Sequence, residues 1–443
     1  MLEQLVRSRW VWLAIALFRV WNALFVRTAF NPDEYWQSTE VAHRMVFGYG
    51  YLTWEWQDDA RLRGYAHPAL FALLYKALEL LGLDSRWAIA YGPRVLQGGL
   101  ASLNDYFTYK LALVYFDQKT AKWTLVCHLV SWFIFYVMVR PFSNSIETIC
   151  TTAALANWPW AFLNTRKKDD EEVDVNALID SRRLKALSWA ALGVLFRPTN
   201  AVLWIYLGGV HLLQSGDRAR LLVKRVLPIA LVTLGTMVII DRVGYGEWTF
   251  VPFNFLKFNL LEGKDRLYGV HPWNWYFTQG YPSIVGTFAP LFLTGWLTAP
   301  ALKKELGNVI FWTLFIYSWS AHKEFRFVLP LLPPALVYTG YCLRNLEQGL
   351  NRERPEGCES HQLERDPLGF VTRKYEFTTD TVSSDKEPLP DYIVLFSTTL
   401  PPVQKLLTRA GYTEAASFFH SQVSGDADDP EAAAAMLVFK HHP

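Results

Sequence analysis

The chain has 443 residues, of which 51% are hydrophobic and 16% aromatic, and its formal net charge is +2. This near-neutral charge gives no support for nucleic-acid binding, and four cysteines without paired spacing indicate neither a disulfide framework nor a zinc site. Long apolar stretches fill most of residues 10–343, whereas the residues after about 344 are hydrophilic. The sequence therefore predicts a mainly α, polytopic membrane protein with a small polar C-terminal part.

About ten apolar stretches approach the roughly 20 residues that a helix needs to cross a bilayer. We expect transmembrane or re-entrant helices at 10–29, 67–82, 94–116, 123–140, 146–163, 184–213, 226–243, 281–300, 308–321 and 326–343. Two of these stretches leave alternatives open. The stretch 67–82 is short and could lie in the membrane interface, and 184–213 is interrupted at Arg197-Pro198-Thr199 and could form two half-helices.

Basic residues indicate the orientation of the chain. Arg7 and Arg9 precede the first apolar stretch, so the positive-inside rule places the N-terminus in the cytosol. Under either alternative above, the loops 31–66, 244–280 and 321–326 then share the opposite side of the membrane.

The hydrophilic C-terminal part is expected to divide in two. After a membrane domain at 1–343, residues 344–388 are predicted to be a disordered linker, and 389–443 a small α+β domain. The expected strands are Tyr392–Ser397, Ala416–Val423 and Met436–Lys440, and the expected helix is Pro402–Tyr412. The count of ten stretches would place this domain in the cytosol.

Two adjacent carboxylates, Asp33 and Glu34, stand at the start of the loop Asn31–Trp56. Adjacent residues do not share one helix face, so at most one of them is expected to reach a reacting group. A single base suits the transfer of a sugar from a phosphate, whereas hydrolysis of a glycosidic bond uses two carboxylates. The alternative is structural, because Asn31-Pro32-Asp33-Glu34 is also a good helix-capping sequence.

The second polar motif is HKEFRF at 322–327, between two apolar stretches. His322, Lys323 and Arg326 could hold a phosphate, with Arg326 binding through two N–H groups and Lys323 acting as a point charge. The alternative is an internal salt bridge with Glu324 and side chains that reach the membrane interface.

Three charged residues, Arg19, Asp105 and Arg197, lie inside apolar stretches. Because burying them in lipid is costly, they should face the protein interior and either pair or bind a ligand. Arg19 and Arg197 are therefore candidates to bind a phosphate. A structural Arg19–Asp105 pair is the alternative for the first of them.

Aromatic residues surround both polar motifs, and aromatic rings suit flat sugar faces. The candidates for contact with a sugar acceptor are Tyr35, Trp36, Trp54, Trp56, His271, Trp273 and Trp275. For the loop around His271 the alternative is an aromatic belt at the membrane interface.

Together, FNPDEYWQSTEVAHRMVFGYGYLTWEW, HPWNWYFTQGYP and HKEFRF closely resemble the lipid-linked mannosyltransferases of the multi-span GT-C class, glycosyltransferase family 22. The resemblance covers about 30–343 and resumes near 389–440. It implies an inverting enzyme of the endoplasmic reticulum membrane that transfers mannose on the lumenal side. The implied donor is dolichyl-phosphate mannose, and the implied acceptor is the GPI-anchor precursor, which would receive its third, alpha-1,2-linked mannose.

The resemblance also assigns roles to residues of this chain. Asp33 becomes the presumed base, with Glu34 as its neighbour or substitute, and Arg197, Lys323 and Arg326 become donor-phosphate ligands. No metal or cofactor is expected beside the lipid-linked donor. The family usually has a further span and then a lumenal C-terminal domain, in contrast to the count of ten above.

Two other functions stay open. One is a related mannosyltransferase that acts on the dolichol-linked N-glycan precursor. The other is a transporter or lipid scramblase in which Asp33, Asp105 and Arg197 form an ion path. That second function predicts charges distributed through the apolar stretches, whereas most charged motifs here cluster in loops.

Overall fold

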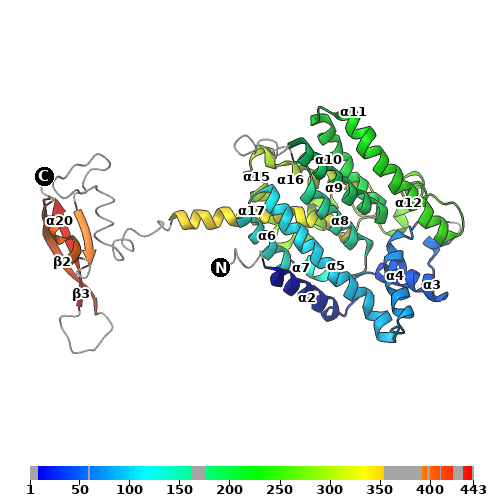
Figure 1. The fold of residues 1–443 in the computed structure, drawn as a ribbon, viewed down its shortest axis with the longest axis horizontal. Coiled ribbons are helices and arrows are strands. Elements are labelled where there is room, and N and C mark those ends of the chain that lie inside the picture. The colour runs from blue at the N-terminus through cyan, green and yellow to red at the C-terminus, as the bar shows by residue number, and fades with distance from the viewer. Residues whose placement is uncertain are drawn as a thin grey trace. The chain divides into compact units, whose positions relative to one another are not determined.

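The computed structural model describes residues 8–57, 60–160, 175–353, 392–396, 400–409, 411–422 and 433–441. The chain divides into two compact units, Met1–Asn345 and Leu346–Pro443. The first unit is helical and the second contains the sheet of the protein (Figure 1).

The first unit is built from helices joined by short connections. In chain order they are α2 (Arg9–Phe25), α3 (Glu40–Phe47), α4 (Ala66–Leu80), α5 (Arg86–Tyr115), α6 (Gln118–Val130), α7 (Trp132–Val137), α8 (Ser143–Asn157), α9 (Val175–Phe196), α10 (Ala201–Gln214), α11 (Arg218–Leu221), α12 (Leu227–Tyr245), α13 (Val251–Leu256), α14 (Tyr281–Val285), α15 (Ala289–Thr298), α16 (Glu305–Ser318) and α17 (Leu332–Glu353). Short π- or 3-10 segments include η1 (Tyr35–Thr39), η2 (Trp54–Trp56), η4 (Pro198–Asn200), η7 (Lys264–Tyr268) and η11 (Phe325–Leu331).

The helices follow most of the expected apolar stretches, with three interruptions. The stretch 184–213 breaks at Arg197 into α9 and α10, as expected, because a helical backbone is disfavoured before Pro198. The stretch 123–140 also divides, at Ser131, and 281–300 divides at Gly286, whose φ is +60°. Neither of these two breaks was expected.

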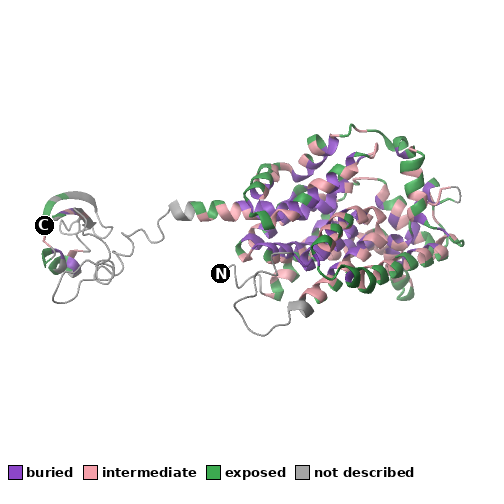
Figure 2. Ribbon diagram, turned by 90° about the horizontal axis from the view of Figure 1, so that it is seen from above, coloured by how far each residue is buried: buried purple, intermediate pink, exposed green. Residues whose placement is uncertain are grey.

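The centre of the first unit is α8, in which every residue from Asn144 to Asn157 is buried. Helices α5 and α9 pack against α8, and α2 packs against α5. Figure 2 shows the buried residues gathered in the middle of the bundle. Gly98 permits the α2–α5 contact, because a Cβ there would lie 2.9 Å from the Arg19 carbonyl oxygen. Thr148 and Thr152 donate to backbone carbonyls one turn back, so these buried hydroxyls are satisfied within α8.

One helical stretch of the described residues is long and apolar enough, by length and composition alone, to cross a membrane. It is Arg218–Tyr245, which contains α11 and α12 and reaches a mean hydropathy of 1.9. Apolar side chains such as Val232 and Val243, 69% and 80% exposed, cover its outer face, which suits a lipid environment. The expected count of ten membrane helices is not confirmed.

The C-terminal unit contains β1 (Tyr392–Phe396), α20 (Leu400–Arg409), β2 (Tyr412–Gln422) and β3 (Ala433–His441). The sheet order is β1-β3-β2, with antiparallel pairing on both sides of β3. The small C-terminal sheet is therefore confirmed. The helix ends earlier than expected, before Gly411, whose φ of +81° permits the turn into β2.

The expected linker at 344–388 is wrong in its first part, because α17 continues to Glu353. The remainder of that linker, from residue 354 onward, lies outside the described residues.

Candidate active site

The loop Asn31–Trp56, the first loop of the chain, folds so that a helical segment begins at Asp33. The Asn31 side-chain oxygen accepts the Asp33 backbone N–H at 3.0 Å, as an N-capping residue does. The chain then continues through the π-helix η1 into α3. The helix cap that is the structural alternative for this sequence is therefore present, and it fixes the backbone from which the Asp33 side chain projects.

The Asp33 carboxylate contacts the Arg326 guanidinium, although 293 residues separate them in the chain. The contact uses Oδ2 of Asp33, and Oδ1 makes no hydrogen bond to the described residues. The Asp33 side chain is 21% exposed. One oxygen is thus held by a cation while the other is open to a substrate.

Glu34 has different surroundings from its neighbour. Its side chain is completely buried, and both its oxygens accept from Arg140 Nη1, at 2.8 and 2.9 Å. The backbone N–H of Phe30 also donates to it at 2.7 Å. This position ties the first loop to the segment between α7 and α8 and leaves no oxygen directed at a substrate.

The HKEFRF motif folds around Glu324. Its carboxylate accepts from Arg326 Nε at 2.7 Å and Nη2 at 2.8 Å, and lies 3.0 Å from His322 Nε2. Burial alone would raise the pKa of Glu324, but the bonds from His322 and Arg326 lower it well below its ordinary value. Asn31 Nδ2 donates to the same carboxylate at 3.1 Å, which joins this motif to the first loop.

Lys323 is buried, 3% exposed, and its ammonium group donates to the backbone carbonyls of His271 and Ser320, at 3.2 and 2.5 Å. No carboxylate of the described residues forms an ion pair with it. Burial lowers the pKa of Lys323, although the charge of Asp265 opposes that shift. Lys323 is therefore a cation for which an anionic ligand would be a favourable neighbour.

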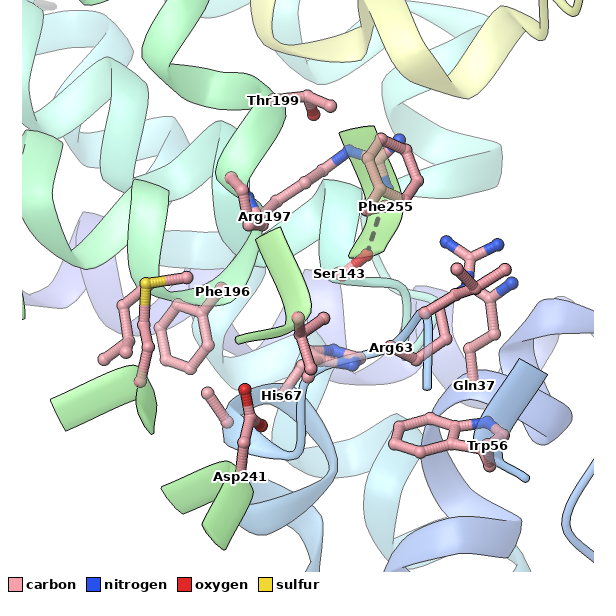
Figure 3. A pocket seen from close by; sticks show the side chains of 17 residues that line it. Gln37, Trp56, Arg63, His67, Ser143, Phe196, Arg197, Thr199, Asp241 and Phe255 are labelled. Carbon is pink, nitrogen blue, oxygen red and sulfur yellow. Dashed lines mark hydrogen bonds between the residues drawn. The ribbon is translucent and has the colours of Figure 1, made fainter. Parts of the chain in front are cut away.

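Arg197 lies at the break between α9 and α10. Its Nε is 3.2 Å from Glu147 Oε2, its Nη1 donates to Ser143 Oγ at 3.3 Å, and its guanidinium stacks 5.0 Å from the centre of the Phe327 ring. Because Phe327 follows Arg326 directly, Arg197 lies beside the HKEFRF motif. Figure 3 shows Arg197 and its bond to Ser143.

A pocket adjoins Arg197 and extends toward α12 (Figure 3). Its lining includes Gln37 and Trp56 of the first loop, Arg63 just before α4, His67 at the start of α4, Thr199 of η4, Asp241 of α12 and Phe255 of α13. It therefore collects residues from five separate parts of the chain around one cavity.

Glu55 was not among the expected site residues, although it lies between Trp54 and Trp56. Its carboxylate accepts from Arg63 at 2.7 Å, from the Tyr268 hydroxyl at 2.7 Å and from Gln37 at 3.2 Å. Burial would raise the pKa of Glu55, but the Arg63 guanidinium and these hydrogen bonds lower it. Glu55 thereby holds the lining residues Gln37 and Arg63 in place.

Asp265 of η7 was also missed. Its Oδ2 accepts from Ser320 Oγ at 3.0 Å and from the backbone N–H groups of Ala321 and His322, at 2.8 and 3.3 Å. These bonds shape the turn that precedes Lys323. Only the three-dimensional contact reveals this role, since the surrounding sequence is an ordinary charged loop.

The candidate aromatic residues divide by exposure. Four are exposed and available to a ligand: Tyr35, Trp36, Trp54 and Trp273, at 42%, 38%, 44% and 68%. Trp56 is buried, but it lines the pocket. Trp275 is 5% exposed and packs in the core between His271 and Phe325, so the structure does not support sugar contact by Trp275 or by the face of His271 stacked on it.

Arg19 does not reach the site. It is fully buried and donates to both oxygens of Asp105, at 2.8 and 2.6 Å, and His128 Nδ1 lies 2.7 Å from the same carboxylate. The expectation that Arg19 binds a phosphate is therefore wrong, and the structural Arg19–Asp105 pair is correct. A buried charge is stabilised when a group of opposite charge is buried next to it.

Comparison with known proteins agrees with this architecture. Residues 10–373 match the family model described as the Alg9-like mannosyltransferase family. The chain is 42% identical over 388 residues to Mannosyltransferase APTG1 of Arabidopsis thaliana, covering 88% of this chain and 68% of that protein. It is 42% identical over 329 residues to GPI alpha-1,2-mannosyltransferase 3 of Homo sapiens, covering 74% of this chain and 56% of that protein.

Among solved structures, the chain resembles ArnT from Cupriavidus metallidurans bound to undecaprenyl phosphate. The TM-score is 0.56 at 15% sequence identity, over 84% of this chain and 66% of that one, so the likeness concerns the fold. ArnT has the GT-C architecture expected here, in a membrane protein. The chain spans 56% to 68% of the length of the two relatives above. Because the family model matches residues 10–373 and a relative is 42% identical over 88% of this chain, the chain belongs to the Alg9-like mannosyltransferase family.

Proposed function

We propose that the chain transfers mannose from dolichyl-phosphate mannose to the GPI-anchor precursor, as its third, alpha-1,2-linked mannose. The observation that carries this proposal is the Asp33–Arg326 contact, which leaves one carboxylate oxygen free, while Arg197 lies near enough to Arg326 for the two charges to interact. A base and a cationic group in one place suit a sugar that leaves from a phosphate.

In the proposed step, Asp33 Oδ1 accepts the proton of the acceptor 2-hydroxyl. The hydroxyl oxygen attacks the anomeric carbon of mannose, and the bond from that carbon to the phosphate oxygen breaks. Dolichyl phosphate departs with the bonding electron pair, and because the hydroxyl attacks the face opposite the phosphate in a single displacement, the configuration at the anomeric carbon inverts. Arg326 keeps the Asp33 carboxylate oriented through their ion pair.

The departing phosphate gains negative charge as the bond breaks. Lys323 has no carboxylate partner within the described part of the chain and can stabilise the negative charge on the phosphate. Arg197 is anchored by Glu147 and presents its guanidinium next to the pocket. His322 is bound to Glu324 and contributes mainly by orienting that carboxylate. Preorganised cations of this kind stabilise developing charge without reorganisation.

The names of related proteins support the GPI-anchor precursor as the proposed acceptor. The proteins of Homo sapiens and Bos taurus that match this chain carry the name GPI alpha-1,2-mannosyltransferase 3. A lipid-linked donor agrees with the absence of a nucleotide-binding glycine motif from the sequence and with the GT-C fold. We place the reaction in the endoplasmic reticulum membrane with the first loop on the lumenal side, and Tyr35, Trp36 and Trp54 at the acceptor's approach.

Complementation tests the proposal. The chain is expressed in cells that lack the third GPI mannose, and the GPI intermediates are analysed by mass spectrometry. We expect the two-mannose intermediate to disappear with the wild-type chain and to persist with Asp33→Asn expressed at the same level. Persistence with the well-expressed wild-type chain would contradict the proposed acceptor. Rescue of an N-glycan mannosyltransferase defect instead would indicate the related pathway.

A further inference from the structure

The pocket beside Arg197 contains more polar groups than the proposed transfer uses. His67, Thr199 and Asp241 line it, and neither the base nor the phosphate-binding cations require them. We propose that this pocket is a hexose subsite, in which these three side chains bind the hydroxyl groups of a substrate sugar. The inference rests on the proposed function and adds the residues that select the sugar.

Two of these groups are buried and make no hydrogen bond of good geometry to the described residues. They are His67 Nε2, on a side chain 3% exposed, and Thr199 Oγ1. Arg63 Nε, at the same pocket, is also unpartnered in the described part of the chain. Leaving a buried polar group unpaired is costly, so several that converge on one cavity indicate a ligand that satisfies them.

Asp241 supplies the strongest acceptor. It is 3% exposed, and its Oδ1 accepts the Tyr65 backbone N–H at 2.9 Å, while its Oδ2 makes no hydrogen bond to the residues described. The helix carrying it approaches closely, because a Cβ at Gly244 would lie 2.2 Å from the Tyr65 ring. One oxygen therefore holds the wall of the pocket in shape and the other is available to a ligand.

The chemistry of the set favours a sugar over other ligands. The Asp241 carboxylate would repel a bare phosphate beside it, although Arg63 and Arg197 also line the pocket, and an alkyl chain would leave every polar group unsatisfied. Hydroxyl groups both donate and accept, so they can pair with the Asp241 carboxylate, the neutral imidazole of His67 and the Thr199 hydroxyl together. Apolar side chains such as Phe196 and Trp56 complete the lining and can cover the faces of a sugar ring.

The pocket also lies close to the proposed base. Gln37, one helical turn after Asp33, lines it, and the charge of Asp33 acts on the Arg63 guanidinium. Arg197 lines the pocket and also contacts Phe327, the residue that follows Arg326. The hexose could belong to the donor or to the acceptor glycan, and the experiment separates the two sources.

The test uses the full chain in lipid nanodiscs with dolichyl-phosphate mannose and the two-mannose GPI intermediate. Asp241→Asn keeps an oxygen for the Tyr65 N–H but removes the charged acceptor, and Thr199→Val keeps the shape but removes the hydroxyl. Thr313→Val is the matched control, since the buried Thr313 hydroxyl bonds only to Val309 of its own helix.

We expect Asp241→Asn to raise the KM of one substrate about tenfold, the effect of losing one charged hydrogen bond. Thr199→Val should raise the same KM by less, and Thr313→Val should change neither KM. A raised donor KM assigns the hexose to the donor, and a raised acceptor KM assigns it to the acceptor. Unchanged KM values in both pocket variants, with activity intact, would overturn the subsite and leave the proposed function standing.

A second measurement needs no turnover. A bound substrate raises the unfolding temperature of the protein, so the shift produced by each substrate reports binding. We expect the shift from one substrate to shrink in Asp241→Asn and Thr199→Val and to persist in Thr313→Val. Equal shifts in all variants, or none in the wild type, would overturn the hexose subsite even if the chain transferred no mannose.

Discussion

Asp33 and Glu34 are neighbours in the chain, yet their carboxylates have different surroundings. Asp33 is partly exposed and keeps one oxygen free beside Arg326, whereas Glu34 is completely buried and bound by Arg140. Because successive side chains leave a helix in different directions, one carboxylate can face the site while the next anchors the loop. The chemistry therefore falls to Asp33 and the attachment of the loop to Glu34.

Replacement of the anchor should destabilise the protein. Glu34→Gln leaves the buried Arg140 charge without its ionic partner, and breaking such a pair costs about 3–5 kcal/mol. We expect a clearly lower unfolding temperature in detergent. Glu247→Gln is the control, because Glu247 is 69% exposed in its pair with Arg61 and such surface pairs contribute about 0–1 kcal/mol. Equal unfolding temperatures for the two variants would contradict the anchoring role.

Lys323 should act on the donor. Lys323→Gln can still donate hydrogen bonds to the carbonyls of His271 and Ser320 but removes the charge. We expect the donor KM to rise on the order of tenfold, because hydrogen bonds to charged groups contribute about 1.5–3 kcal/mol. Lys264→Gln, at an exposed position paired with Glu262, is the control. An unchanged donor KM and kcat in Lys323→Gln would remove Lys323 from the phosphate site.

At the scale of elements, α17 and α15 approach closely through a glycine. A Cβ at Gly295 would lie 2.1 Å from the backbone carbonyl oxygen of Tyr338. The Tyr338 hydroxyl in turn donates to the Lys303 carbonyl at 2.7 Å and accepts the Gly307 N–H at 2.9 Å. This contact places α17, and the HKEFRF motif before it, against the rest of the bundle.

Gly295→Ala should therefore be destabilising. The clash involves backbone, which cannot move aside as a flexible side chain can, and overpacking typically costs about 1–3 kcal/mol. Gly235→Ala in α12 meets nothing within 4 Å and should be neutral or stabilising, since alanine favours a helix over glycine by about 1 kcal/mol. Thermal unfolding of the two variants measures the difference, and a stable Gly295→Ala would contradict the close packing.

The helices could largely be predicted from the sequence, but most of the breaks within them could not. The break at Arg197-Pro198 was predictable because proline restricts the residue before it. The breaks at Ser131 and Gly286 were not, because these small residues barely interrupt the apolar pattern and tertiary packing decides there. The polar sequence after residue 344 predicts a disordered linker, yet α17 continues to Glu353.

At the scale of the whole molecule, the site joins segments from both ends of the first unit. Asp33 meets Arg326 across 293 residues, and Glu55 meets Tyr268 across 213. Charge distribution predicted that these loops share one side of the membrane, but it could not predict which side chains would pair. For the same reason Arg19 was a phosphate candidate from sequence, although Asp105 neutralises it.

The whole-molecule arrangement also bears on the transporter alternative. An ion path would need Asp105 accessible to water, yet Asp105 is fully buried between Arg19 and His128. The charged groups used in the proposed reaction include instead Asp33 with Arg326, and Arg197 at the pocket. This distribution suits a reaction centre on one side of the protein.

The most direct test of a reaction centre at Asp33 is the mannosyl-transfer rate of Asp33→Asn in nanodiscs, at saturating donor and acceptor. The amide preserves the size of the side chain but cannot take the hydroxyl proton, so we expect kcat to fall about 100- to 10,000-fold. The KM values and the unfolding temperature should change little, and Glu247→Gln should keep full activity. A kcat close to that of the wild type in Asp33→Asn would contradict the assignment of the base, and with it the proposed mechanism.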